Sequence, residues 1–349
     1  MTEATQASEA AGSMFRGWVW SDRQLVGRPE HGAEVGKILR QQPGTIAVTE
    51  LRRSHAERLG ADDALGLDRW AIEDLGSDRE RPRLDVVGDS IVVLSGTVAL
   101  DPQTMEVVKR PLGLLVTSRL LAVVEDDDEF GRLSTVLEAA CPTLSDNGTA
   151  GVLHAVLAEV VSGYTEALTA LESKADQLAE ALFDHRPLDR GQQLEAFRLR
   201  RALAELLRVI QPMQDVTTTL AQAAAHAAQE GVADDDVVAR LIPARTARRF
   251  ADVADHVAHA ADFANSQRDV LASLYDTSLS LADVRLNTIM KKLSAWAAII
   301  AVPTLITGFM GMNVPYPGYG TSAGVIAAIA VMIAAVLTLF VLFKRNDWL

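Results

Sequence analysis

The sequence predicts an α+β domain, built as an α/β layered sandwich, that continues into a long helical hairpin, a stalk helix and a two-helix transmembrane hairpin. Three observations support this fold class. The first part of the 349-residue chain mixes β-rich runs with helical patterns. The middle part is rich in Ala, Leu and Glu at helical spacing. Residues 293–343 carry no charged side chain.

The expected boundaries follow changes in composition along the chain. They are a disordered start at 1–14, the α/β domain at 15–148, the helical hairpin at 149–233, the stalk helix at 234–292, the first membrane span at 293–312, an outer loop at 313–322, the second span at 323–343 and a basic end at 344–349. The start has no apolar core, so we expect no signal peptide.

Short β-rich runs define the α/β domain. We expect strands at 17–20, 45–49, 90–100, 111–117 and 120–124, and helices at 32–42 and 53–65. The order of the strands cannot be read from these runs. The acidic run Glu125–Glu129 follows the last strand, and we interpret it as a solvated loop rather than a cation site.

A long antiparallel helical hairpin is expected next. Residues 152–183 place Leu, Val and Ala side chains on one stripe. The break at 184–190 contains Pro187, which suits the opening of another helix. A second helix at about 189–229 runs back, and residues 231–236 form a polar turn.

A third helical segment starts between Asp234 and Thr246 and is expected to be exceptionally long. If it is continuous from Thr246 to Met312, it measures about 100 Å at 1.5 Å per residue. A soluble domain does not need a helix of this length, whereas a stalk that runs into a membrane does.

Two apolar segments, Leu293–Met312 and Gly324–Phe343, each approach the ~20 residues that cross a bilayer. The basic flanks are Lys291 and Lys292 before the first span and Lys344 and Arg345 after the second. Because the connecting loop is uncharged, the positive-inside rule places both chain termini in the cytoplasm, and we expect a plasma-membrane protein. The alternative is a buried hairpin of a soluble protein, which these paired lengths and flanks disfavour.

Composition excludes several functions. The formal net charge is −13, and only three charged residues follow residue 292, so the soluble part is acidic and unsuited to nucleic acid. The single cysteine, Cys141, rules out a disulfide within one chain. We find no phosphate-binding glycine loop and no nucleophile–base set, so we expect neither nucleotide binding nor enzymatic activity.

One face of the first span is mostly small or polar. Its members recur every three or four positions: Asn287, Met290, Ser294, Ala297, Ala301, Thr304, Gly308 and Gly311. Two interpretations remain open on periodicity alone. The stripe is either a face for close helix packing or the lining of a pore formed by several copies of this helix.

Three motifs make the sequence recognisable. Gly311-Met312-Asn313 ends the first span, the run 287–294 precedes it, and the chain ends in Lys344-Arg345-Asn-Asp-Trp-Leu349. Together they resemble the CorA family of divalent-cation transporters. The likeness is clearest from about Phe250 onward, whereas residues 71–75 and 81–82 are only weakly similar to a family segment.

The resemblance implies a funnel-shaped homopentamer that admits Mg²⁺, with Co²⁺ and Ni²⁺ as further ions and no prosthetic group. It places Asn313, with Gly311 and Met312, at the outer pore mouth, where amide oxygens would accept hydrogen bonds from the water shell of Mg²⁺. Leu293 would form an apolar constriction. The implied lining is Asn287, Met290, Leu293, Ala297, Ala301, Thr304 and Gly308. Intracellular Mg²⁺ would close the pore by binding Asp252 of one subunit and Asp74, with Glu73 beside it, of the next.

The chain departs from the family pattern in ways that affect ion choice. Ala301 stands where a pore methionine is common, and the outer loop lacks an acidic residue. Asp255, His256 and His259 cluster with Asp252 and Asp262 on the stalk, and imidazole favours Zn²⁺, Ni²⁺ or Co²⁺ over Mg²⁺. A zinc transporter of the ZntB branch is therefore one alternative, an exposed amphipathic face is the simpler explanation of the cluster, and a membrane-anchored scaffold that transports nothing is the other alternative.

Overall fold

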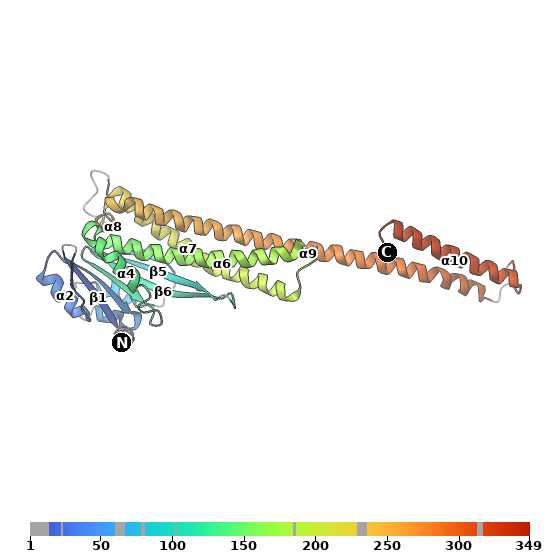
Figure 1. Cartoon of the computed structure of the whole chain (residues 1–349), viewed down its shortest axis with the longest axis horizontal. Helices are drawn as coiled ribbons and strands as arrows, with labels where there is room; N and C mark the ends of the chain where they lie inside the picture. The colour runs from blue at the N-terminus through green and yellow to red at the C-terminus, as the bar shows by residue number, and fades with distance from the viewer. Residues whose placement is uncertain are drawn as a thin grey trace, which may run out of the picture. The chain divides into compact units, whose positions relative to one another are not determined.

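The computed structural model describes residues 14–21, 24–59, 67–77, 81–101, 103–183, 186–228, 236–312 and 317–349. The chain forms two compact units. The first comprises residues up to 177 together with 192–272, and the second comprises 178–191 together with 273–349. Helices α6, α7 and α9 each contribute residues to both units, which are described separately below (Figure 1).

The first unit contains a seven-stranded sheet in the order β2-β1-β3-β7-β6-β5-β4. The strands are β1 Phe15–Ser21, β2 Gln24–Gly27, β3 Ile46–Arg52, β4 Arg83–Val87, β5 Ser90–Leu100, β6 Val107–Val116 and β7 Leu120–Glu125. Strands β3 and β7 pair in parallel, with Glu50 opposite Val123 and Arg52 opposite Glu125, while the other neighbours pair antiparallel. Strands β2 and β4 were not predicted. Both lie at sheet edges and are short and half-exposed, so they lack the apolar signal of a buried strand.

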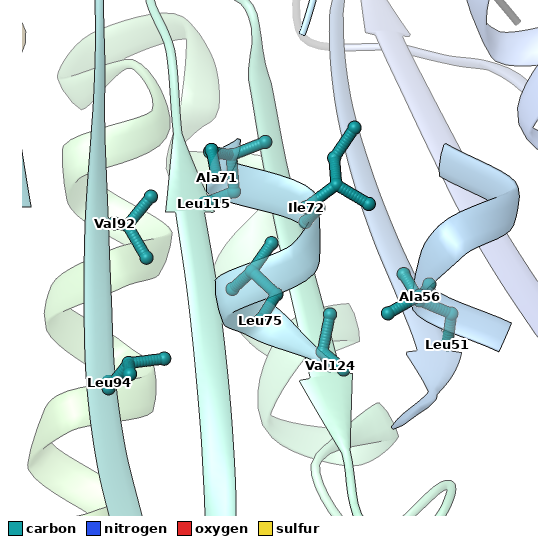
Figure 2. Close-up of a cluster of buried hydrophobic side chains, with 10 residues drawn as sticks. Leu51, Ala56, Ala71, Ile72, Leu75, Val92, Leu94, Leu115 and Val124 are labelled. Atoms are coloured by element: carbon teal, nitrogen blue, oxygen red, sulfur yellow. The ribbon is translucent and has the colours of Figure 1, made fainter. Parts of the chain in front are cut away.

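Three short helices cover one face of the sheet: α2 Gly32–Gln41, the 3₁₀ helix η1 Arg53–Leu59 and α3 Arg69–Leu75. Three more follow β7, namely α4 Ser134–Ala140, η3 Cys141–Thr143 and α5 Leu144–Asn147. Helix α4 lies on the opposite face, where Ser134 donates to Glu50 of β3 and Glu138 accepts from Trp18 of β1. Figure 2 shows α3 and η1 over the strands that carry Val92, Leu115 and Val124, and these side chains form one buried cluster with Ile72 and Leu75. The helix expected at 53–65 is thus a 3₁₀ helix over Arg53–Leu59, and its expected remainder lies outside the described residues.

Helices α6 Thr149–Phe183 and α7 Arg190–His226 pack on the other face of the sheet. The buried Tyr164 hydroxyl of α6 donates to the Gly96 carbonyl of β5 at 2.9 Å. The Ser95 hydroxyl of β5 lies 3.5 Å from the Met213 sulfur of α7. Because side chains alternate along a strand, Ser95 points away from the face that carries Val92 and its neighbours.

The stalk helix begins at the late end of the expected range. Residues 237–246 form two short pieces, α8 Val237–Leu241 and the 3₁₀ helix η4 Ala244–Thr246, and only then does α9 run from Ala247 to Met310. Pro243 explains the break, since the residue before a proline is driven out of the helical region, and Ile242 is extended. In the first unit α9 packs on α6, where the Phe250 ring meets the His154 ring edge-on at 5.9 Å.

The second unit contains the rest of α9 and helix α10 Ser322–Arg345, which runs back beside it (Figure 1). Pro303 lies inside α9 without ending it. Their connection turns at Gly318 and Gly320, whose φ angles of 96° and 74° suit glycine. A Cβ at Gly324, the third residue of α10, would lie 2.2 Å from the Gly318 carbonyl oxygen, so this turn is tightly closed.

The fold class predicted from the sequence is confirmed by this arrangement and by the structural likeness reported below. Among the described residues, the helical stretches Ala244–Met310 and Ser322–Arg345 are long and apolar enough to cross a membrane, and within the most apolar 18 residues of each only 11% and 0% are buried in one chain. The funnel-shaped pentamer remains a prediction.

Candidate functional site

The small and polar stripe of α9 is fully exposed in the single chain. At about 100° per residue, its members fall on one side of the helix. The exposed members are Asn287, Met290, Ser294, Ala297, Ala301, Thr304, Gly308 and Gly311. Four of them, Ala297, Ala301, Thr304 and Gly308, line a shallow groove along α9. Leu293, the expected apolar constriction, is 64% exposed beside this stripe.

Helix α10 does not cover this stripe. Within the membrane-length part of α9, Ala295 is fully buried and Ile299 is 8% exposed, and both lie on the side of the helix away from the stripe. A Cβ added to Gly308 would meet no atom within 4 Å. The stripe is therefore not the surface by which α9 packs against α10, and it must contact water, lipid or another copy of the chain.

The end of α9 carries part of the signature motif. The Gly311 N–H donates to the Thr307 carbonyl at 2.9 Å, and the Met312 N–H donates to the Phe309 carbonyl at 3.2 Å, so the first two signature residues continue the last helical turn. Asn313 lies outside the described residues, and its place at the pore mouth remains a prediction.

Asp74 is buried and paired. It lies on α3 with 6% of its surface exposed, and both carboxylate oxygens accept from the Arg83 guanidinium, Oδ2 at 2.5 Å. The same guanidinium donates from Nε to Asp85 at 2.6 Å. These hydrogen bonds, above all those that Arg83 donates to Asp74, raise the pKa of Arg83. A cation that bound Asp74 would have to displace Arg83, whereas the neighbouring Glu73 is exposed.

The acidic and imidazole groups of the stalk do not form a metal site within one chain. Asp252, Asp255, His256, His259 and Asp262 are all exposed on α9. Throughout the part of the chain that the structure describes, no three His, Cys, Asp or Glu side chains come together as a group that could hold a metal ion. Any site at these residues would need a ligand from a second subunit.

Helix α6 places a further imidazole, that of His154, near Asp252 and Arg249 of the stalk. Burial lowers the pKa of His154, and the Arg249 charge lowers it further against the opposing effect of Asp252. His154 thus favours its neutral form, while its ring packs on Phe250.

Sequence reasoning missed a buried pair of carboxyl groups where β3 and β7 end. Glu50 has no exposed surface and Glu125 is 3% exposed. Glu125 accepts from the backbone N–H groups of Gly131 at 2.8 Å and Leu133 at 3.1 Å. Glu50 accepts through Oε2 from the Ser134 hydroxyl at 2.5 Å. The interpretation of the run Glu125–Glu129 as a solvated loop is therefore wrong for its first residue, because parallel pairing with β3 carries that residue into the core.

Burial and mutual repulsion favour a state in which the two carboxyl groups hold one proton between them. Burial, and next the charge of Glu50, raise the pKa of Glu125 to about 8. Burial also raises the pKa of Glu50, although Ser134 and Arg16 counteract it. The Oε1 atom of Glu50 has no other donor within the described structure, and a protonated Glu125 supplies one. In the sequence, Glu50 and Glu125 are two acidic residues far apart from each other, so no local pattern predicts that they form a pair.

These features define a membrane protein with a large soluble domain: an α/β domain, a long helix shared between two units, and two exposed apolar helical segments. Residues 46–345 match the family described as CorA-like Mg²⁺ transporter protein, and the chain belongs to that family.

The relatives agree over most of the chain. The cobalt/magnesium transport protein CorA of Thermotoga maritima is 24% identical over 311 residues, which cover 88% of this chain and 84% of the relative. The complete structure of the CorA magnesium transporter from Methanocaldococcus jannaschii superposes with a TM-score of 0.68 at 22% identity, covering 87% of this chain and 92% of that one. The ZntB cytoplasmic domain from Vibrio parahaemolyticus gives a TM-score of 0.51 at 12% identity, covering 68% of this chain and 88% of that one, which is a likeness of fold alone.

Proposed function

We propose that this chain is the protomer of a homopentameric plasma-membrane channel through which Mg²⁺ enters the cell, with Co²⁺ and Ni²⁺ as further ions. Family membership supports divalent-cation transport. One observation favours α9 as the pore helix: its small and polar stripe is exposed on the side that α10 leaves free. Several copies of α9 that turn this stripe inward would enclose a channel.

The lining residues suit a hydrated cation. The Thr304 hydroxyl donates to the Ile300 carbonyl at 2.8 Å, so its oxygen still offers a lone pair toward the pore axis. Asn313 would present a carboxamide oxygen from each subunit at the mouth. Mg²⁺ releases water reluctantly, so neutral oxygens that bind its water shell cost less than oxygens that replace the shell.

The membrane potential supplies the driving force in this proposal. A divalent ion gains about 4.6 kcal/mol per 100 mV when the inside is negative. By the positive-inside rule, the basic flanks of both spans support a cytoplasmic position for the α/β domain and both termini. Transport therefore needs neither nucleotide nor catalysis.

Regulation would involve carboxylates that face each other across a subunit boundary. Asp252 and Glu73 are exposed and available, and Asp74 joins them only when it leaves Arg83. A bridging divalent ion would remove their mutual repulsion and stabilise the closed assembly. The zinc alternative gains no support from one chain, because His256 and His259 do not assemble into a site.

The proposal is tested by ion uptake into proteoliposomes that contain the purified full-length protein. Mg²⁺, Co²⁺ and Zn²⁺ are compared under an imposed potential, with Asn313→Ala as the test variant. Asn346→Ala makes the same chemical change at the other end of the hairpin, where the amide only donates to the Leu342 carbonyl at 3.0 Å.

Mg²⁺ entry that Asn313→Ala abolishes and Asn346→Ala preserves would support the channel and its mouth. Zn²⁺ flux without Mg²⁺ flux would transfer the protein to the zinc branch. If no ion crosses the membrane, the result would favour the alternative that the protein is a membrane-anchored scaffold that transports nothing. A ring of five subunits in detergent is the matching structural expectation, measured by light scattering.

A further inference from the structure

A groove in the second unit lies between the loop that joins α6 to α7 and the stalk part of α9. Its lining consists of Arg186, Pro187, Leu281, Val284 and Arg285. The loop is fastened to the helix here, because the Leu188 N–H donates to the Ser278 hydroxyl oxygen at 2.9 Å and both residues are buried. The groove therefore combines two arginines with an apolar floor on a fixed frame.

Both guanidinium groups are open to a ligand. Arg186 and Arg285 are exposed, and no described residue forms an ion pair with either one. Two guanidinium forks beside each other match the oxygens of a phosphate group, which each can bind through two parallel hydrogen bonds.

Charge is segregated around this part of α9. At about 100° per residue, Arg285 and Lys292 lie on one side of the helix with Leu281. Asp276 and Asp283 fall on the opposite side, on the stripe that continues into the proposed pore lining. The basic side is also the side that buries Ala295 and Ile299 higher up the helix, so it faces outward from the proposed channel axis.

The groove lies at the level of the inner membrane surface in the proposed orientation, and the inference rests on the proposed function for this point alone. Arg285 precedes Leu293, the first residue of the charge-free span, by eight positions, or about 12 Å of helix. The headgroup layer of a bilayer is roughly 5–7 Å thick on each side. A long arginine side chain that extends toward the membrane can reach a headgroup phosphate from this position, and Lys292 lies directly at the boundary.

We propose that this groove binds the headgroup of an anionic phospholipid from the cytoplasmic leaflet. Arg186 and Arg285 hold the phosphate, Pro187, Leu281 and Val284 form the floor beneath the headgroup, and Lys292 adds positive charge above them. Basic pockets beside membrane helices on the cytoplasmic side recognise such lipids. The bound lipid would tie the loop between α6 and α7 to the membrane surface.

The test uses the full-length protein in neutral detergent, titrated with phosphatidylglycerol or with phosphatidylcholine of the same acyl chains. Native mass spectrometry counts the bound lipids. The test variant is Arg186→Gln/Arg285→Gln. The matched control, Arg200→Gln/Arg248→Gln, removes the same charge from two exposed arginines of the first unit. Both variants change exposed side chains, and an unchanged melting temperature verifies that each is folded.

The expected result is a preference for phosphatidylglycerol that weakens about fivefold for each arginine removed, whereas the control stays within about twofold of wild type. Equal phosphatidylglycerol affinity in the test variant and wild type would overturn the inference. Displacement of the lipid by an equal concentration of inorganic phosphate would also overturn it, by identifying a site for free anions. Flux in phosphatidylcholine vesicles is measured separately, so failure of this inference is distinguishable from failure of the channel.

Discussion

Replacing Glu50 by glutamine should reduce the alkaline sensitivity of the α/β domain. Glutamine keeps the oxygen that accepts from Ser134 and places an amide N–H₂ where Oε1 now lacks any donor except Glu125. The pair then needs no shared proton. Because one negative charge is gone and a permanent donor faces Glu125, only burial remains to raise the pKa of that residue.

The magnitude follows from the pKa of Glu125, which folding raises from 4.5 to about 8. A carboxyl group whose pKa is raised by folding stabilises the folded state fully below pH 4.5, and this stabilisation disappears as pH rises through 8. Each pKa unit corresponds to about 1.4 kcal/mol, so the wild-type free energy of unfolding should fall by about 2 kcal/mol between pH 6.5 and 9. His154, whose pKa is lowered, acts in the opposite direction but only below its ordinary pKa of 6.5.

The assay is equilibrium urea unfolding of the full-length protein in detergent, followed by tryptophan fluorescence at several pH values. The loss across this range should be smaller in Glu50→Gln than in wild type, and this variant should be more stable than wild type at pH 9. Glu205→Gln is the control, because Glu205 forms only an exposed-helix ion pair with Arg201. An unchanged pH slope in Glu50→Gln would refute the shared proton.

Two further substitutions test the pore stripe and the pairing of Asp74. Gly308→Leu should block flux but leave the melting temperature within about 2 °C of wild type, because its Cβ meets open space. Gly324→Ala should instead cost about 1–3 kcal/mol, since its Cβ would collide with the Gly318 carbonyl; equal thermal stability of the two variants would contradict this reading of the helix faces. Arg83→Gln should destabilise the domain by roughly 3 kcal/mol because it removes the guanidinium that pairs with the buried Asp74, and Mg²⁺ should raise its melting temperature more than that of wild type. A normal melting temperature for Arg83→Gln in urea-free buffer would count against the ion pair.

The sequence was most informative where structure depends on local pattern. The helical periodicity of residues 149–310 and the charge-free segments predicted the long helices and the apolar pair, because both signals repeat over many turns. The start of α9 was left open between Asp234 and Thr246, and the effect of Pro243 on the backbone of Ile242 explains why the continuous helix begins only at the end of that range.

Features that depend on strand order could not be predicted. The Glu50–Glu125 pair exists because β3 and β7, separated by more than sixty residues, become parallel neighbours. Likewise, the guanidinium that pairs with Asp74 belongs to Arg83 of β4, an edge strand with too little apolar character to be predicted from the sequence. For the pore stripe, the sequence periodicity predicted which residues belong to it, but only the position of α10 showed which side of α9 remains exposed.

The closed turn between α9 and α10 limits what can act on this protein from outside the cell. In the proposed orientation, an external inhibitor would meet only the short segment from Gly311 to Thr321, which bears no charge. Such a compound could gain little from ion pairing and would have to recognise amide and hydroxyl groups. We therefore expect effective blockers to be mimics of a hydrated cation, similar in size and hydrogen-bonding pattern to the ion with its water shell, rather than simple polycations.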